Sequence, residues 1–422
     1  MADENAGALS GINVLDLSRF IAGGFCTRLL AEMGARVIKI EPPISGDQLR
    51  LLGPSNGDSW LMPPTISPMF LHCNTGKESL ALDLKKPESI ALIKRLIPRM
   101  DVVVENFSPH VMPSIGLAYD DLRRIREDIV MCSISGFGAE GPLADMRAVD
   151  PVVQAMSGML SVCGEESGYP YLAGNGIPDT ASATAAALAI VSALLARTRT
   201  GVGARIDLSM MHTVLAMDCT AVPYAVVSHG EHAIPRSGRF HHLACPWGVF
   251  KGPQGRYMVV VASGDPQWES LARVMGRADL IDAPEFASSE ARMRNREQVH
   301  SIIEGFLQTF PTAEAAFHAL AQAKILSGIV LEPWEAASHP QTVHRGMMRQ
   351  VHHPYTGPLS VLTATPHFSN SSARVGRAPF IGEHNRSVLR EFLGISEAEL
   401  DDLHAKAVLF EDVTVAHLAS VP

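Results

Sequence analysis

The sequence is poor in cysteine, in aromatic residues and in metal-binding patterns. Its 422 residues include six cysteines, none of them in a CxxC pair, and aromatic residues make up 6% of the chain. In a chain of this length, few and unpaired cysteines are typical of reduced, mostly buried thiols in a cytoplasmic protein rather than of a disulfide framework. The ligand spacing of a structural zinc site is also missing, so we expect no metal.

The chain has fewer basic than acidic residues. The 44 acidic residues outnumber the 35 basic ones, which gives a net charge of −9. Proteins that bind nucleic acid or anionic membranes are normally basic, so we predict that this one binds neither. The first residues, MADENAGALSG, lack the basic and apolar regions of a signal peptide.

Two long uncharged runs were considered as membrane spans. Residues 59–76 contain three prolines, which exclude a regular helix. The alanine-rich run between Asp179 and Arg197 is too short to cross a bilayer, and we expect it to form a buried helix. The sequence therefore predicts no membrane-spanning segment.

Several common catalytic motifs are absent. After the first predicted strand stand Ala22, Gly23, Gly24 and Phe25, which do not fit the GxGxxG pattern of a dinucleotide site. The sequence has no P-loop, no GxSxG elbow and no HExxH motif. The glycines of SGFGAEGP follow a late strand and precede a proline, and this pattern favours a turn.

Hydrophobic periodicity indicates an α/β fold. Hydrophobic residues make up 46% of the chain and charged residues 19%, enough apolar side chains for a large core in two or three domains. Short β-branched runs alternate with helical patterns and predict a largely parallel sheet covered by helices. The predicted strands comprise residues 12–17, 36–41, 79–84, 101–106 and 129–135. From about His229 the pattern changes to that of a smaller α+β domain with a strand beginning at Tyr257.

Two aspartates are candidates for chemistry. Asp179 follows Pro178 at the start of the alanine-rich helix, where it could cap the helix or act as a nucleophile beside free N–H groups. Asp150 precedes Pro151 and a second helical pattern, so it too could serve as a cap. Local sequence alone leaves both alternatives open, for each residue.

Basic side chains and histidines offer weaker signals. Arg147 could bind an anion or could simply be solvated, and Arg19 lies near Asp16 at the end of the first strand. The adjacent pair His241 and His242 lies in a loop, where such pairs are more often surface residues than ligands. With Arg19 they form a hypothetical substrate loop that could bind a second carboxylate.

The order of motifs along the chain resembles CoA-transferase family III, the CaiB/BaiF family. The resemblance begins in LSGINVLDLSRFIAGGFCTRLLAEMGARVIKIEPP and continues through NTGKESLALDLK, DVVVENFSP, SISGFGAEGP and VDPVVQAMSG, then TRTGVGARIDLSM, HRGMMRQVHHP and RAPFIGEH. It implies a Rossmann-like large domain formed by residues 1–225 and 336–422, a small domain over residues 226–335, and an interlocked, ring-like homodimer. CoA would move from an acyl-CoA to a free carboxylic acid. Coenzyme A thioester is then a substrate, and no cofactor is permanently bound.

The resemblance also implies roles for individual residues. Asp179 would be the nucleophile, forming first an acyl anhydride and then a CoA thioester, with Asp150 in support. The implied CoA contacts are Ile21, Ala22, Leu82, Asp83, Leu84, Lys85, Asn106, Phe107, Ser108, Arg147 and Ala148. Pro42 and Ser114 stand where relatives carry cations, and Pro178 stands where many have glycine.

Departures from the family patterns bear on the reaction. The racemase branch has a His-Asp pair where this chain has Val149 and Asp150, so an α-methylacyl-CoA racemase is the second hypothesis. Ile21 stands where the formyl-CoA:oxalate branch has glutamine, which indicates an acceptor larger or less polar than oxalate. A CoA-binding subunit without activity is the non-enzymatic alternative.

Overall fold

The computed structural model describes residues 7–53, 66–174, 176–363, 367–371 and 373–412. The chain divides into two compact units. The first comprises Met1–Ser157, Gly174–Met217 and Gln341–Pro422, so it combines both ends of the chain. The second comprises Gly158–Ala173 and Asp218–Pro340.

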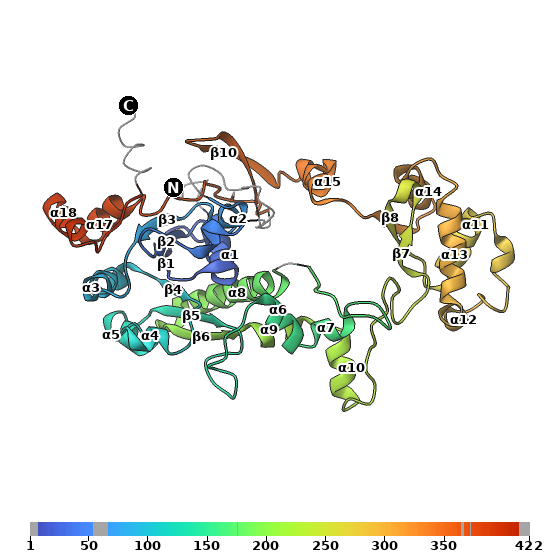
Figure 1. Cartoon of the computed structure of the whole chain (residues 1–422), viewed down its shortest axis with the longest axis horizontal. Coiled ribbons are helices and arrows are strands. Elements are labelled where there is room, and N and C mark those ends of the chain that lie inside the picture. The colour runs from blue at the N-terminus through green and yellow to red at the C-terminus, as the bar shows by residue number, and fades with distance from the viewer. Residues whose placement is uncertain (1–6, 54–65, 175, 364–366, 372, 413–422) are drawn as a thin grey trace. The chain divides into compact units, whose positions relative to one another are not determined.

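The first unit is built on a six-stranded parallel sheet (Figure 1). Its strands in spatial order are β3 (Glu78–Ala81), β2 (Arg36–Glu41), β1 (Asn13–Asp16), β4 (Val102–Glu105), β5 (Val130–Ser135) and β6 (Ala204–Ser209). Val14 of β1 pairs with Val37 on one side and with Val102 on the other. The predicted parallel α/β sheet is therefore confirmed.

Helices cover both faces of this sheet. On one face α1 (Phe20–Glu32) packs against β1 and β2, and α8 (Ile177–Thr200) packs against α1, β5 and β6. On the other face α3 (Pro87–Leu96), α5 (Tyr119–Ile125) and α17 (Asn385–Leu393) enclose a core that includes Leu15, Ile38 and Val103 (Figure 1). The sheet thus forms the middle layer of three.

Helix α8 differs from its prediction in one respect. Ala183 and Ile190 are fully buried, but Leu188 and Leu195 on the outer face are 69% and 59% exposed. The prediction of a buried helix is therefore correct for one face only. By length and composition α8 could also cross a membrane, but its inner face packs on the sheet.

Further elements complete the first unit. They are α2 (Pro68–Asn74), α4 (Val111–Ser114), α6 (Asp150–Met156), α9 (Met210–Met217), the antiparallel hairpin β10 (Met348–His353) and β11 (Gly357–Leu362), and α18 (Glu397–Ala405). The short helix α16 (Pro340–His344) lies at the boundary between the two units.

The second unit combines helices with a three-stranded antiparallel sheet. The strands are β7 (Trp247–Lys251), β8 (Tyr257–Val261) and β9 (Leu326–Ile329). The helices are α7 (Met159–Val162), α10 (Ala221–Val227), α11 (Asp265–Val274), α12 (Ser289–Arg294), α13 (Arg296–Leu307), α14 (Ala313–Gln322) and α15 (Pro333–Ser338). Phe250, Trp268 and Ile303 are central to its core.

Candidate active site

The site lies in the first unit, in a cavity of about 490 Å³ at the carboxyl ends of β4 and β5. Ligands of open parallel sheets bind at this edge, where the strand order reverses, here between β1 and β4. The predicted residues that line the cavity are Asp179, Asp150, Ile21, Ala22, Asn106, Phe107, Ser108, Arg147 and Ala148. The structure therefore brings together predicted residues from four separate segments of the chain.

Asp179 lies in the first turn of α8 and is not its cap. The helix begins after Gly176, which adopts a φ of 77°, a left-handed conformation that glycine accepts without strain. Asp179 is half-buried on the cavity wall. Burial and the negative charge of nearby Asp150 raise the pKa of its carboxyl from 3.8 to about 6. The side chain is thus a carboxylate at neutral pH, held in surroundings that disfavour its charge.

Asp150 is the first residue of α6, and its side chain does not cap that helix. Its Oδ1 accepts a hydrogen bond of 2.7 Å from Nε2 of Gln154, one helical turn further on. Its Oδ2 is buried and has no hydrogen-bond partner among the described residues. Our sequence analysis did not identify Gln154, although the spacing of four residues in DPVVQ places both side chains on the same face of a helix.

The turn from β1 into α1 forms another wall of the cavity. Asn106 holds this turn from both sides, since its Oδ1 accepts from the Arg19 amide at 2.8 Å and its Nδ2 donates to the Arg19 carbonyl at 2.7 Å. The next residue, Phe20, has a φ of 58°, which is costly for a bulky side chain. The Phe20 amide donates to Asp47 at 3.2 Å. These bonds hold a strained residue at the cavity wall.

A buried ion cluster stands behind this turn. Asp16 at the end of β1 forms an ion pair of 2.9 Å with Lys77, and Lys39 forms one of 3.0 Å with Asp47. Lys39 also donates to the Ser18 carbonyl at 2.8 Å. Burial opposes the charge of Asp16, but the two lysines hold its pKa at about 2. The sequence analysis did not predict this cluster. Lys39, a charged residue within the predicted strand RVIKIE, was the feature that could have indicated it.

The last group of predicted CoA contacts does not line the cavity. These residues, Leu82, Asp83, Leu84 and Lys85, follow β3. None of them is among the described residues that line the cavity. Leu82 is buried, and Lys85 is exposed with its amide bonded to the Asp83 carboxylate. Arg19 is absent from the lining too; its guanidinium lies 5.3 Å from the centre of the Phe107 ring.

The predicted histidine pair belongs to the second unit. His241 stacks on Trp247 with ring centres 3.9 Å apart, and on His242 at 4.6 Å. Burial and the neighbouring imidazole lower the pKa of His241. In the same loop Arg239 forms ion pairs with Glu297 and Glu304. Both histidines are half-buried in an aromatic stack rather than free on the surface.

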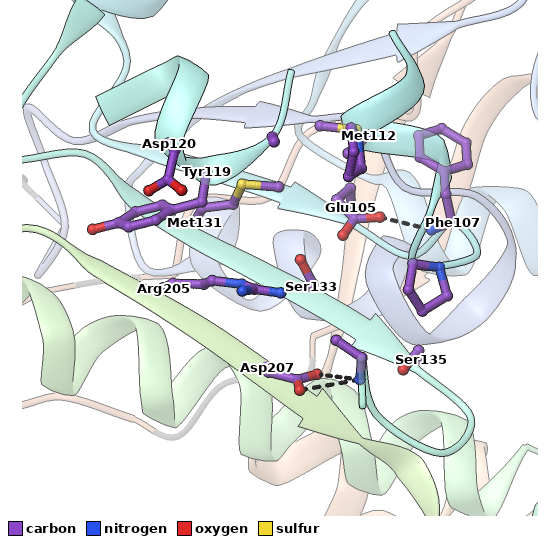
Figure 2. A pocket seen from close by; sticks show the side chains of 14 residues that line it. Glu105, Phe107, Met112, Tyr119, Asp120, Met131, Ser133, Ser135, Arg205 and Asp207 are labelled. Atoms are coloured by element: carbon purple, nitrogen blue, oxygen red, sulfur yellow. Dashed lines mark hydrogen bonds between the residues drawn. The ribbon is translucent and has the colours of Figure 1, made fainter. Parts of the chain in front are cut away.

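A smaller cavity of about 140 Å³ lies beside β4, β5 and β6 (Figure 2). Glu105 accepts a hydrogen bond of 2.8 Å from the Phe107 amide, and burial raises the pKa of its carboxyl. Asp207 accepts from the Ala139 amide at 3.1 Å, and Arg205 points toward Ser133 (Figure 2). Because Phe107 lines both cavities, the Glu105 carboxylate holds a segment that shapes the larger one.

Comparison with known proteins shows which sequences and structures the chain resembles. Residues 9–385 match the family model described as CoA-transferase family III. Succinyl-CoA:glutarate CoA-transferase of Mus musculus is 31% identical over 96% of this chain and 91% of its own length. Formyl-CoA:oxalate CoA-transferase of Streptomyces avermitilis is 33% identical over 95% of this chain and 99% of its own length. The crystal structure of a CAIB/BAIF family protein from Brucella suis superposes with a TM-score of 0.83, at 28% identity, over 92% of this chain and all of that one.

The fold and the cavity therefore define an α/β enzyme with a carboxylate site at the switch point of a parallel sheet. The chain belongs to CoA-transferase family III. It is an acyl-CoA:carboxylate CoA-transferase, as the sequence analysis predicted.

Proposed function

We propose that Asp179 is the nucleophile and that the cavity around it is the site of CoA transfer. Its carboxylate attacks the thioester carbonyl of the donor, the C–S bond breaks, and CoA leaves as the thiolate. The thiolate then attacks the aspartyl carbonyl of the mixed anhydride, which releases the donor acid and leaves an aspartyl-CoA thioester. Covalent catalysis of this kind replaces one difficult exchange by easier steps.

The second half of the reaction reverses the first. The acceptor carboxylate attacks the aspartyl thioester and expels the CoA thiolate, which gives an anhydride between Asp179 and the acceptor. The thiolate attacks the acceptor's acyl carbon, so acceptor-CoA leaves and the Asp179 carboxylate is restored. Every step exchanges one acyl bond for another, without an oxidant or a net proton.

The position of Asp179 in the cavity is the observation that carries this proposal. Its raised pKa of about 6 leaves it ionised at neutral pH and more basic than an ordinary aspartate. The N–H groups of Ile177 and Asp179 in the first turn of α8 precede the first bond within the helix, from the Thr180 amide to Gly176, and their partial positive charge favours a developing oxyanion.

CoA itself needs cations because its phosphates are anionic. Arg147 is exposed at the cavity rim and forms no ion pair among the described residues. Lys85 is exposed beyond β3. We assign both to the phosphates, and the segments 21–22, 82–84, 106–108 and Ala148 to the remainder of CoA.

The acceptor acid is larger or less polar than oxalate in this proposal. Ile21, Val149 and Met210 give the cavity apolar walls near Asp179. Succinyl-CoA and acetyl-CoA, offered with a panel of mono- and dicarboxylic acids, test the assignment. Preference for oxalate over every larger acid contradicts it. Failure of all dicarboxylates, with monocarboxylates accepted, removes the hypothesis that the protein binds a second carboxylate.

Two other functions have distinct signatures. A racemase needs a second base, but Val149 precedes Asp150, and its side chain is 64% exposed and apolar. Rapid α-deuteration of an acyl-CoA in D₂O without an acceptor acid would favour the racemase. An inactive CoA-binding subunit predicts that Asp179→Ala leaves function intact, whereas a transferase loses nearly all of its activity.

We also propose a homodimer in which a second copy of the chain covers the outer face of α8, in the interlocked arrangement of the family. Leu188 and Leu195 expose apolar surface there. Light scattering should give a dimer mass, and Leu188→Lys should weaken the dimer. Leu326→Lys, at a residue of similar exposure in the second unit, is the control. A monomer at all concentrations contradicts the proposal.

A further inference from the structure

Gln154 connects two parts of the active site. Its side chain is completely buried in α6. Nε2 donates to Oδ1 of Asp150 at 2.7 Å and lies 3.3 Å from the carbonyl oxygen of Gly174. Gly174 belongs to the segment that leads into α8, the helix that carries Asp179. The Gln154 amide therefore connects the Asp150 carboxylate to the segment that precedes α8.

The Asp150 carboxylate depends on this amide. Its other oxygen, Oδ2, is buried without a hydrogen-bond partner in the described part of the chain. A buried carboxylate is costly unless hydrogen bonds or opposite charges compensate it. The hydrogen bond from the Gln154 side chain offsets part of the cost of burying the Asp150 carboxylate. Without it, neither oxygen would have a side-chain hydrogen bond among the described residues, and the carboxylate would be free to rotate.

The charge of Asp150 has a direct effect on Asp179. Both carboxyl groups line the same cavity, and two like charges at close range repel each other. When Asp179 attacks a thioester, its own charge leaves with the thiolate, so the repulsion is relieved in the acylated enzyme. An Asp150 carboxylate held in one orientation therefore favours the covalent state of Asp179 over its free carboxylate.

We propose that Gln154 is a positioning residue of the transferase: its buried amide holds the Asp150 carboxylate in a fixed orientation in the cavity that Asp179 also lines. The inference rests on the proposed function of Asp179. Gln154 acts through Asp150 and does not contact the reacting atoms. Its loss should lower kcat and leave the KM for acyl-CoA nearly unchanged, because CoA binding uses other residues.

A double-mutant cycle tests the proposal. Gln154→Leu removes the donor with little change in volume and should lower kcat about 10- to 100-fold, the range for loss of a hydrogen bond to a charged group. Asp150→Asn should lower kcat as well. If Gln154 acts through Asp150, the double variant should match Asp150→Asn alone; fully additive losses, or an unchanged kcat in Gln154→Leu, overturn the proposal.

Controls separate positioning from folding. Ser157→Ala alters another buried polar residue at the end of α6 and should leave kcat unchanged. If Gln154→Leu fails to fold, Gln154→Met provides a more flexible side chain without a donor, and the same cycle applies. The steady-state fraction of enzyme carrying an adduct on Asp179 should fall in either variant. An undiminished adduct fraction contradicts the proposal, whereas an active Asp179→Asn variant contradicts the proposed function itself.

Discussion

Asp150 and Asp179 line one cavity from two different helices, and the charge of Asp150 adds to burial in raising the pKa of Asp179 to about 6. Neither carboxylate caps its helix. From local sequence, each aspartate could have capped its own helix. The structure instead shows two carboxyl groups in one cavity, where the charge of one affects the pKa of the other. The predictions below follow from this pair and from the groups that support it.

The first prediction concerns the pH dependence of catalysis. The nucleophile must be ionised, so kcat/KM should fall as the pH drops through about 6. Asp150→Asn removes the like charge and should move this limb to lower pH, even where the rate is reduced. Initial rates from pH 4.5 to 8 measure both effects. A limb that stays in place in Asp150→Asn shows that the two carboxylates are not coupled.

The second prediction concerns stability. The pKa of Asp179 is higher in the folded chain than its ordinary 3.8, so the folded state binds more protons between these values. Stability is therefore lost as the pH rises through this interval, and the ionised side chain is unfavourable at neutral pH. Asp179→Asn should raise the free energy of unfolding by about 1–3 kcal/mol at pH 7.5.

Denaturant unfolding of both proteins at pH 7.5 and pH 4 measures this difference. The gain should shrink at pH 4, where the wild-type carboxyl takes up its proton. A variant that is less stable than the wild type at pH 7.5 would show that Asp179 makes a favourable charged contact instead.

The third prediction concerns the buried ion cluster behind the β1–α1 turn. Lys77→Met leaves Asp16 buried and deprived of its nearest cation, and should cost about 3–5 kcal/mol. The exposed pair of Arg124 and Asp121 is the matched control, because Arg124→Met should cost at most about 1 kcal/mol. Equal losses in the two variants would mean that the cluster has no special importance for the fold.

The fourth prediction concerns the cations assigned to CoA. Arg147→Ala and Lys85→Ala should each raise the KM for acyl-CoA about 3- to 10-fold, more at low salt, with kcat nearly unchanged. Arg99→Ala changes an exposed cation outside the cavity and serves as the control. The assignment fails for either residue if its variant matches Arg99→Ala at every ionic strength.

Much of the fold could be predicted from the sequence because five strands have short apolar runs at their centres. β1 to β5 are buried between two helical layers, and runs such as Val14–Leu15 and Val102–Val104 are completely buried there. The sixth strand, β6, was missed because it lies at the sheet edge and alternates exposed Arg205 and Asp207 with apolar residues. The hairpin β10–β11 was missed for a similar reason, since its histidines, prolines and glycines indicated a loop.

The site was predictable only in part. Local sequence marked Asp179 and Asp150 as candidates, resemblance to the family assigned their roles, and the structure brings them together. The partners that support them depend on tertiary contacts. Lys77 lies 61 positions from Asp16 along the chain, and no local pattern joins them. Gln154 had a helical spacing from Asp150, but the same spacing occurs on any helix and carries no functional meaning until burial is known.

Mass spectrometry of the enzyme quenched during turnover tests the central claim most directly. Acid quenching followed by proteolysis should yield a CoA thioester on the peptide that contains Asp179, and hydroxylamine should convert that residue to a hydroxamate. Asp179→Asn, treated in the same way, should yield neither product. Turnover without any adduct, or an adduct on a different residue, would contradict the account.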